Sequence, residues 1–371
     1  MEGRGQTVCL NLIVKDEAHV IRRCLASARP LIDAWVIADT GSTDGTQEII
    51  REAMAGIPGV LLERPWVDFA HNRTEVIEAA RGRCDYNLMI DADEEFAIDE
   101  CFVMPPLSAD SYNIEVRYGG LSYHRRQLVR GALPWRYVGV LHEYITCDEA
   151  RTEATLSGVR TVVHHEGARS RDPLTYRRDA LVLERALIEE PDNTRYVFYL
   201  AQSYRDAGEP DLALRQYRRR AAMGGWRDEV WFSLYRIAQL EAQLGRPWPE
   251  VMASYMTAFQ SLPERAEPLY QIAMHYQSTR EFHAAKGFFE WARKVPAPGP
   301  TGLFVDRAIY DYLLDLEYAV CCYYTGDHPL AIGVNSRLLA GGELPPHLIA
   351  RVAENRQLSV NALAGGSVAA A

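Results

Sequence analysis

The periodicity of hydrophobic and polar positions along the chain changes near residue 170. Before it, short apolar runs alternate with stretches whose apolar residues recur every three or four positions, as on a one-sided helix. The runs predict strands at residues 8–14, 35–38, 60–63, 86–90 and 159–164, with β-rich sequence from Ser111 onward. The stretches between them predict helices at residues 17–28, 46–55 and 70–80. This alternation indicates an α/β domain whose mainly parallel sheet is covered on both faces.

After residue 170 the pattern is helical throughout, and a motif of small and large residues repeats. Its copies are Leu200, Ala201, Tyr204, Ala213 and Tyr217; Ile237 and Ala238; Ile272, Ala273, Tyr276, Ala285, Phe289 and Ala292; and Tyr318, Ala319, Cys322, Ala331 and Leu338. Such a motif is typical of tetratricopeptide helix pairs, which recur about every 34 residues. We therefore predict an α/β domain over residues 1–170, an all-α repeat domain over 171–360 and a disordered, small-residue tail over 361–371.

Composition and charge narrow the classes of function. The net charge of -10 argues against nucleic acid as a partner. A basic run at Arg215, Arg218, Arg219 and Arg220 has helical spacing, so we interpret it as a solvated helix face.

The cysteines and apolar runs bear on the compartment. The seven cysteines are odd in number and form no CxxC pair, which indicates reduced thiols in a cytoplasmic protein. The apolar run at residues 8–14 is too short to span a bilayer, so we expect no transmembrane segment.

Two carboxylates at the end of a predicted strand are the strongest chemical signal. Asp91 and Asp93 flank Ala92 directly after the apolar run 86–90. The carboxyl ends of parallel strands meet where α/β sheets bind ligands. Two carboxylates there can hold a hard divalent cation that bridges a diphosphate, although acidic loops are more often merely solvated.

Two further turns follow strands. The segment from Val36 to Thr46 runs from a strand through a Gly- and hydroxyl-rich turn into a helix, an arrangement that favours anionic or polar ligands. Ser42, Thr43 and Asp44 could equally cap that helix. Likewise, Asp16 in the turn after residues 8–14 either caps the next helix or touches a ligand.

These segments, in order, resemble family 2 glycosyltransferases with the GT-A fold. The matching stretches are IVKDEAHVIRRCLAS, VIADTGSTDGTQEII, PWVDFAHNRTEVIEAARG and YNLMIDADEEF. A further stretch, WRYVGVLHEY at residues 135–144, resembles the GxxHE segment of bacterial members that carry tetratricopeptide repeats. The resemblance spans residues 8–167, and the helical repeats agree with the same subfamily.

The resemblance implies a catalytic domain that binds a nucleotide-sugar, expected to be a UDP-sugar, with Mn²⁺ or Mg²⁺. Metal ligands are then Asp91, Asp93 and, late in the domain, His165, for which a structural role is the alternative. Thr40 stands where many members carry a second aspartate that reads the base. The residues implied to contact the donor are Val14, Lys15, Asp16, Glu17, Asp39, Thr40, Gly41, Ser42, Asp44, Trp66, Asn72, Arg73, Asp91 and Ala92.

Inverting transfer needs a general base beside the acceptor. Glu143, with His142 next to it, is the candidate, and a surface carboxylate is the alternative. The acceptor is expected to be a peptide, protein or glycan, which the repeats could present. One rival hypothesis is a degenerate transferase whose repeats serve as a scaffold for a protein partner. A second is a nucleotidyltransferase or phosphatase that uses the same carboxylates but leaves the TGSTDGT and GVLHE segments unexplained.

Overall fold

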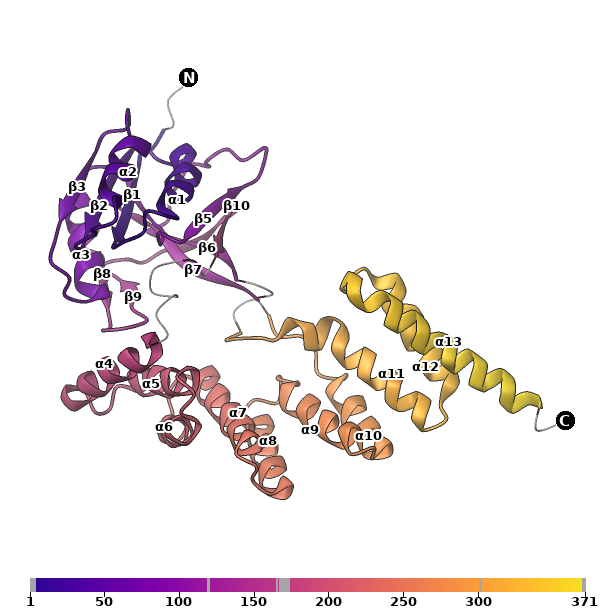
Figure 1. Ribbon diagram of the computed structural model, residues 1–371. Coiled ribbons are helices and arrows are strands. Elements are labelled where there is room, and N and C mark those ends of the chain that lie inside the picture. The colour runs from indigo at the N-terminus through magenta and orange to yellow at the C-terminus, as the bar shows by residue number, and fades with distance from the viewer. Residues whose placement is uncertain (1–4, 119–120, 165, 167–173, 300–301, 369–371) are drawn as a thin grey trace. The chain divides into compact units, whose positions relative to one another are not determined.

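The computed structural model describes residues 5–118, 121–164, 166, 174–299 and 302–368 (Figure 1). The strands are β1 (Val8–Val14), β2 (Ala34–Asp39), β3 (Gly59–Glu63), β4 (Tyr86–Met89), β5 (Glu94–Ile98), β6 (Ser111–Tyr118), β7 (Leu121–Arg130), β8 (Arg136–Val138), β9 (Tyr144–Thr146) and β10 (Glu153–Val163). The helices of the first part are α1 (Ile21–Ala28), α2 (Thr46–Ala53), α3 (Phe69–Ala80), α4 (Thr175–Glu189) and α5 (Thr194–Asp206), with a 3₁₀ turn at Arg29–Leu31. Those that follow are α6 (Pro210–Ala222), α7 (Arg227–Gln243), α8 (Trp248–Ser261), α9 (Glu267–Ser278), α10 (Phe282–Ala292), α11 (Leu314–Tyr324), α12 (His328–Gly341) and α13 (Pro346–Val368), with a π-helical turn at Ile309–Leu313.

One mixed, mainly parallel sheet organises the first part of the chain, as the sequence predicts. Its strand order is β3-β2-β1-β4-β7-β6-β10-β5. The strands β3, β2, β1 and β4 are parallel neighbours, whereas β4–β7, β7–β6 and β10–β5 are antiparallel pairs. A separate two-stranded sheet pairs β8 with β9. The parallel half brings the carboxyl ends of β1, β2 and β4 to one edge.

Helices cover both faces of the parallel strands because successive side chains of a strand point to opposite faces. Leu10 and Leu12 of β1 share a core with Ile21 and Leu25 of α1. On the other face, Cys9 packs in a cluster with residues of β2 and α3. All of these side chains are fully or almost fully buried, which explains why the strand reads as a continuous apolar run.

The predicted elements of the α/β part agree with the structure except at three places. The last strand, expected from residue 159, begins already at Glu153. The helix expected from residue 17 begins only at Ile21, after a turn. β5 was missed, because Glu94 and Glu95 resemble a solvated acidic loop. The structure instead buries Glu94 to 3% exposure and pairs β5 with β10 at the edge of the sheet.

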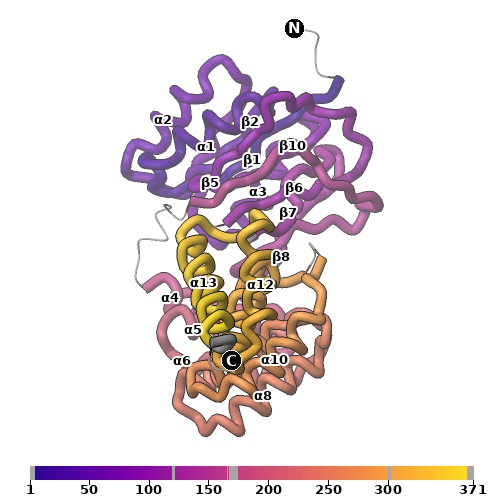
Figure 2. The backbone as a smooth tube through the Cα atoms, turned by 90° about the vertical axis from the view of Figure 1, so that its right-hand side faces the viewer, coloured from indigo at the N-terminus to yellow at the C-terminus, as the bar shows by residue number. Residues whose placement is uncertain are grey.

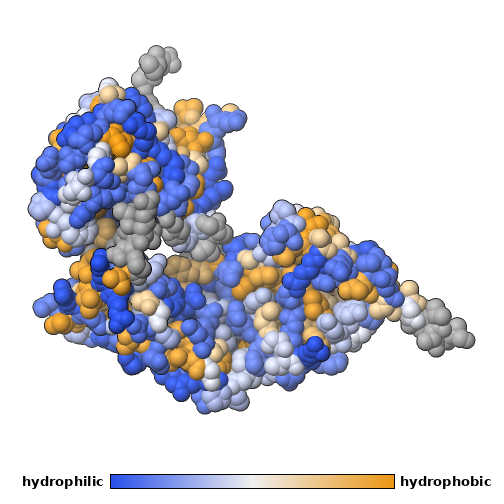
Figure 3. All heavy atoms as spheres, viewed as in Figure 1, coloured by the Kyte–Doolittle hydropathy of each residue, from blue (hydrophilic) through white to orange (hydrophobic). Residues whose placement is uncertain are grey.

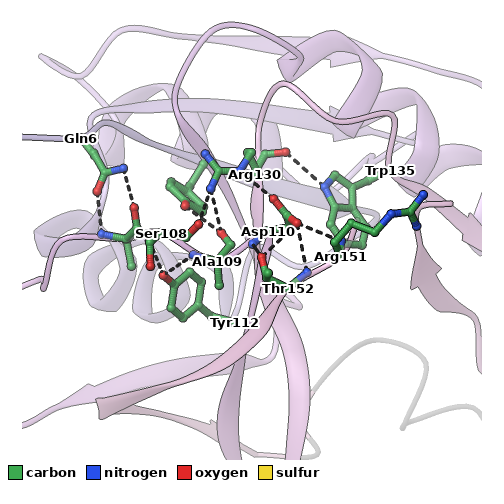
Figure 4. A network of polar contacts seen from close by, with 11 residues as sticks. Gln6, Ser108, Ala109, Asp110, Tyr112, Arg130, Trp135, Arg151 and Thr152 are labelled. Carbon is green, nitrogen blue, oxygen red and sulfur yellow. Dashed lines mark hydrogen bonds and ion pairs between the residues drawn. The ribbon is translucent and has the colours of Figure 1, made fainter. Parts of the chain in front are cut away.

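A polar network fastens the amino-terminal end of β6 to its neighbours (Figure 4). The carboxylate of Asp110 accepts hydrogen bonds from the backbone N–H groups of Arg151 and Thr152 at 2.9 and 3.1 Å, and from Nε of Arg130 at 3.0 Å. These hydrogen bonds lower the pKa of Asp110 to about 2. Since Arg130 pairs with Tyr86 at the start of β4, the network lies at the opposite end from the candidate carboxylates.

Contacts within the chain form two compact units, Met1–Glu209 and Pro210–Ala371. The first helical pair, α4 and α5, therefore belongs with the sheet, whereas the sequence sets the boundary near residue 170, and that boundary stays a prediction. In the second unit the paired helices are α7 with α8, α9 with α10, and α11 with α12, and α13 runs beside α12 (Figure 2).

The repeated small residues lie where paired helices meet. Ala273 of α9 and Ala285 and Phe289 of α10 are fully buried in one core. Ala319 and Ala331 occupy the corresponding places in α11 and α12, at 1% and 0% exposure. Small side chains let two helix backbones approach closely, and the aromatic ring fills the remaining space. The predicted all-α region of tetratricopeptide type is confirmed.

The basic run in α6 is only partly a solvated face, and Arg220 corrects that interpretation. Its side chain is fully buried and its Nη2 and Nε lie 2.9 and 3.1 Å from the carboxylate of Glu229. Nη1 donates to the carbonyl of Gly224 at 2.7 Å. A buried guanidinium needs such partners, and helical spacing alone does not reveal them.

The end of the chain also differs from expectation. α13 extends to Val368, into the segment predicted as a disordered tail, while residues 369–371 lie outside the described range. Alanine and leucine favour helix, so this composition suits a helical end as well as a frayed one.

Three further features concern the helices, the surface and the thiols. Among the helices that the structure describes, none is both long and apolar enough to cross a membrane. On the face drawn in Figure 3, hydrophilic residues cover much of the sheet unit, with apolar side chains in scattered groups. The seven cysteines, all in the described residues, are free thiols.

Candidate functional site

Two loops at the carboxyl ends of β1 and β2 hold each other in place. Asp16, with a backbone φ of 55°, donates its N–H to Oγ of Ser42 at 2.9 Å and accepts from the N–H of Thr43 at 2.7 Å. The N–H of Glu17 donates to Oγ1 of Thr46 at 2.9 Å. Asp16 therefore links the two loops and does not cap α1, whose N-cap residue makes no side-chain hydrogen bond.

The Gly- and hydroxyl-rich turn is closed by its own aspartates. Asp39 is 2% exposed, and its carboxylate accepts from the N–H of Ser42 at 3.1 Å and from Nε2 of Gln47 at 2.7 Å. Asp44 accepts from the N–H groups of Ala18 at 2.9 Å and Thr46 at 3.1 Å. Partial burial opposes the shift, but these hydrogen bonds and the Thr46 hydroxyl lower the pKa of Asp44.

Gly41 and Gly45 allow the sharp path of this turn. Their φ angles are 105° and 89°, in the region that favours glycine. Gly45 precedes α2 as its N-cap residue and brings no side-chain cap, so Asp44 takes over part of that role through Thr46. The hydroxyl of Thr40 donates to the carbonyl of Val14 at 3.0 Å, and both residues are buried. Of the predicted donor contacts in these loops, Lys15, Gly41 and Asp44 are exposed.

The segment before α3 is shaped by Asn72. This residue is fully buried, accepts from the N–H of Val67 at 3.0 Å and donates to the carbonyl of Pro65 at 3.1 Å. Asp68 caps α3 through the N–H of His71 at 2.7 Å. Trp66 and Val67 are 43% and 53% exposed, so their side chains are parts of this segment that a ligand can reach.

Two arginines clamp the first carboxylate of the Asp91–Asp93 pair. Arg73 of α3 forms a hydrogen-bonded ion pair with Asp91, and Nη1 of Arg125 in β7 lies 3.6 Å from its other oxygen. Nη2 of Arg125 also lies 2.5 Å from Glu94. Burial alone would raise the pKa of Asp91, but Arg73 and Arg125 hold it below its ordinary value. For Glu94 burial prevails, and its pKa is raised.

The predicted base lies on the other side of the same guanidinium. Glu143 lies in the turn between β8 and β9, and its Oε1 is 2.7 Å from Nε of Arg73. Its side chain is 12% exposed, which removes the alternative of a fully solvated carboxylate. The guanidinium also lies over the ring of Tyr137, 5.5 Å from its centroid, and burial raises the pKa of that phenol to about 12. Arg73 thus contacts both Asp91 and Glu143.

The oxygen ligands suit a hard divalent cation, although the described residues form no closed cage around one. Asp91 and Asp93 supply the carboxylate oxygens that Mg²⁺ and Mn²⁺ accept. In the described part of the chain, no group of three or more His, Cys, Asp or Glu side chains is arranged to hold a metal ion. His165 lies outside the described residues. A cation bound at Asp91 would therefore have to replace the ion pairs that Arg73 and Arg125 make with this carboxylate.

Arg125 was not anticipated from the sequence. It lies in a polar run of β7, His124-Arg125-Arg126, between apolar ends. A charged side chain in the middle of a strand within a mixed sheet was the available signal, because such a residue is costly to bury without a partner.

The fold and these residues define an α/β domain that carries acidic residues at the carboxyl end of its parallel strands. Residues 11–104 match the model of the family "Glycosyl transferase family 2". The chain therefore contains a family 2 glycosyltransferase domain, followed by helices of tetratricopeptide type. Members of this family generally use a nucleotide-sugar donor and a divalent metal ion.

A curated relative is the TPR repeat-containing protein of Synechococcus elongatus, which is 43% identical over 93 residues. The match covers 25% of this chain and 22% of that protein, so it spans about a fifth of the relative's length.

Two solved structures are also similar to parts of this chain. BtubC from P. vanneervenii is 18% identical with a TM-score of 0.40, over 54% of this chain and 85% of that one. YrrB, described as a TPR protein with an unusual peptide-binding site, is 13% identical with a TM-score of 0.35, over 48% and 83%. At these scores neither likeness bears on function.

Proposed function

We propose that this protein is a metal-dependent, inverting glycosyltransferase that moves a hexose-type sugar from a UDP-sugar to a peptide, protein or glycan acceptor. The observation that carries the proposal is the position of Arg73 between Asp91 and Glu143. One side chain touches both a carboxylate suited to the donor diphosphate and a carboxylate suited to act as a base. Nothing in a merely structural acidic loop requires that convergence.

The proposed reaction divides the work among the chain's own residues. The exposed parts of the loops at residues 15–18 and 40–46 and the indole of Trp66 bind the nucleoside. Arg73 and Arg125 supply fixed positive charge beside the diphosphate, which favours its departure. Mn²⁺ or Mg²⁺, held by Asp91 and Asp93, would add further positive charge to that leaving group.

Glu143 takes the proton of the acceptor O–H or S–H group as that group attacks the anomeric carbon. The bond from this carbon to the diphosphate breaks with its electron pair, and the nucleoside diphosphate leaves. Because the acceptor enters on the face opposite the leaving group, the configuration at the anomeric carbon inverts. His142 beside Glu143 shapes the same turn.

Thermal unfolding with nucleotides tests the donor half of this proposal. A ligand that binds only the folded state stabilises it by about 2.7 kcal/mol at 100 times its dissociation constant. We expect UDP with Mn²⁺ to raise the melting temperature of the wild type, and the Asp91→Ala, Asp93→Ala double variant to lose that shift. Glu100→Ala, an exposed carboxylate of the same unit, serves as the control that keeps it.

Other outcomes change the assignment. A shift with GDP in place of UDP would retain the transferase but replace the donor. The absence of a shift with every nucleotide would contradict the proposal and favour the degenerate scaffold.

A further inference from the structure

The turn that carries the candidate base lies outside the main sheet. It connects β8 and β9, which form a separate pair of three-residue strands whose Tyr137 and Ile145 pack in a cluster with Ile77 of α3. Two-stranded hairpins are marginally stable in water. The backbone of His142 also has φ 51°, in the left-handed region, and such a conformation costs about 1–3 kcal/mol outside glycine. A strained residue next to Glu143 persists only if surrounding groups hold it.

Side chains from one helical turn of α5 contact His142 and can hold it in this conformation. Nη2 and Nε of Arg195 donate to the carbonyl of His142 at 2.7 and 3.2 Å. The ring of Tyr199 stacks on the imidazole of His142, with centroids 3.9 Å apart and planes 11° from parallel. One helical turn separates Arg195 from Tyr199, so both side chains lie on the same face of α5.

Further contacts extend the hold to both sides of His142. The guanidinium of Arg195 lies over the rings of Tyr144 and Tyr199, at 5.2 and 4.9 Å from their centroids. Tyr196, in the same turn of α5, lies beside Gly139, because a Cβ built on that glycine would be 3.9 Å from Cε1 of the Tyr196 ring. The helix thus contacts the turn before, at and after His142.

We propose that Arg195 and Tyr199 are positioning residues for Glu143, which they hold in place through the backbone and ring of His142. This inference rests on the proposed role of Glu143 as the base. Arg73 contacts the Glu143 carboxylate, while α5 fixes the backbone from which that side chain extends. Helix α5 is then part of the catalytic apparatus and not only a support for later repeats.

Kinetics of four variants test the inference. We expect Arg195→Ala and Tyr199→Leu to lower kcat for nucleotide-sugar hydrolysis or transfer roughly 10- to 100-fold, because small misplacements of a catalytic group have effects of that size. UDP-glucose, UDP-N-acetylglucosamine and GDP-mannose serve as probes. The donor KM and the Mn²⁺-dependent thermal shift should stay unchanged. Tyr199→Phe keeps the stacked ring and should keep kcat, as should Arg205→Ala, since Arg205 lies in α5 but pairs with Asp206.

A double-mutant cycle separates positioning from a general effect. If Arg195 acts through Glu143, then Arg195→Ala has no further effect on a Glu143→Gln background. An equal loss on both backgrounds, or a normal kcat in Arg195→Ala with an active wild type, would overturn the inference while leaving the proposed function intact.

Amide hydrogen exchange reports how firmly the turn is held in place, and it does not require enzymatic activity. Amides of residues 139–144 should exchange faster in Arg195→Ala and Tyr199→Leu than in the wild type or Arg205→Ala. Unchanged exchange would overturn the inference. A wild type that binds no nucleotide would instead contradict the proposed function, and with it the role of Glu143 as a base.

Discussion

The two sides of the candidate site are held in different ways. On the side of the proposed donor site, hydrogen bonds between backbone N–H groups and Asp16, Asp39 and Asp44 hold the loops after β1 and β2. On the other side, the turn at His142 and Glu143 contacts Arg73 from α3 and Arg195 and Tyr199 from α5. The donor loops are thus fixed by a local motif, while the turn that carries Glu143 is assembled from distant segments. Substitutions on the two sides should therefore have different effects.

Loss of the base should have the largest effect. We expect Glu143→Gln to reduce transfer or donor hydrolysis about 10²- to 10⁴-fold, the range typical of general-base catalysis. Nucleotide binding should be retained, because the donor loops do not depend on this turn. Steady-state kinetics and thermal shift with UDP measure the two quantities. Glu149→Gln, an exposed carboxylate that follows β9, is the matched control. A normal rate in Glu143→Gln would mean that the base lies elsewhere.

Removal of Arg73 tests the junction between the two sides. Arg73→Met leaves Asp91 and Glu143 without their shared partner, and breaking a buried ion pair typically costs about 3–5 kcal/mol. We expect a loss of unfolding free energy near the lower end of this range, since the Asp91 side chain is 35% exposed. Urea unfolding measures this loss. Arg64→Met, whose side chain is 40% exposed and 3.6 Å from Glu75, should stay within about 0.5 kcal/mol of the wild type. If Arg73→Met were as stable as the wild type, the ion pairs of Arg73 with Asp91 and Glu143 would contribute nothing to the stability of the fold.

The smallest expected effect concerns the donor loops and pH. Because the pKa of Asp44 is lowered in the folded state, its contribution is present above the ordinary carboxyl pKa and disappears as pH falls through the lowered value. Asp44→Asn should therefore cost about 1 kcal/mol at pH 7, as expected for the loss of charge-assisted hydrogen bonds, and progressively less on acidification. Melting temperatures from pH 7 to pH 3 measure this difference. A difference that grows toward acidic pH would contradict it.

Sequence predicted the donor side far better than the other side. The bounds of β1 and the start of α2 follow from local apolar periodicity, and both agree with the structure. Glu143 was identified by resemblance alone, and its ion pair with Arg73 joins residues 70 positions apart in the printed sequence. No periodicity encodes such a contact. Arg125 and Glu94 were missed for the same reason: each is acceptable inside the domain only because the other neutralises it.

The attachment of α5 to the turn at His142 has a consequence for how such proteins can recombine. A crossover near residue 170 would exchange Arg195 and Tyr199 along with the repeats and leave the turn without its support. A crossover after Glu209, where the first compact unit ends, would transfer the catalytic turn together with the helix that holds it. Hybrid enzymes that combine this domain with foreign repeat arrays should therefore be joined after α5.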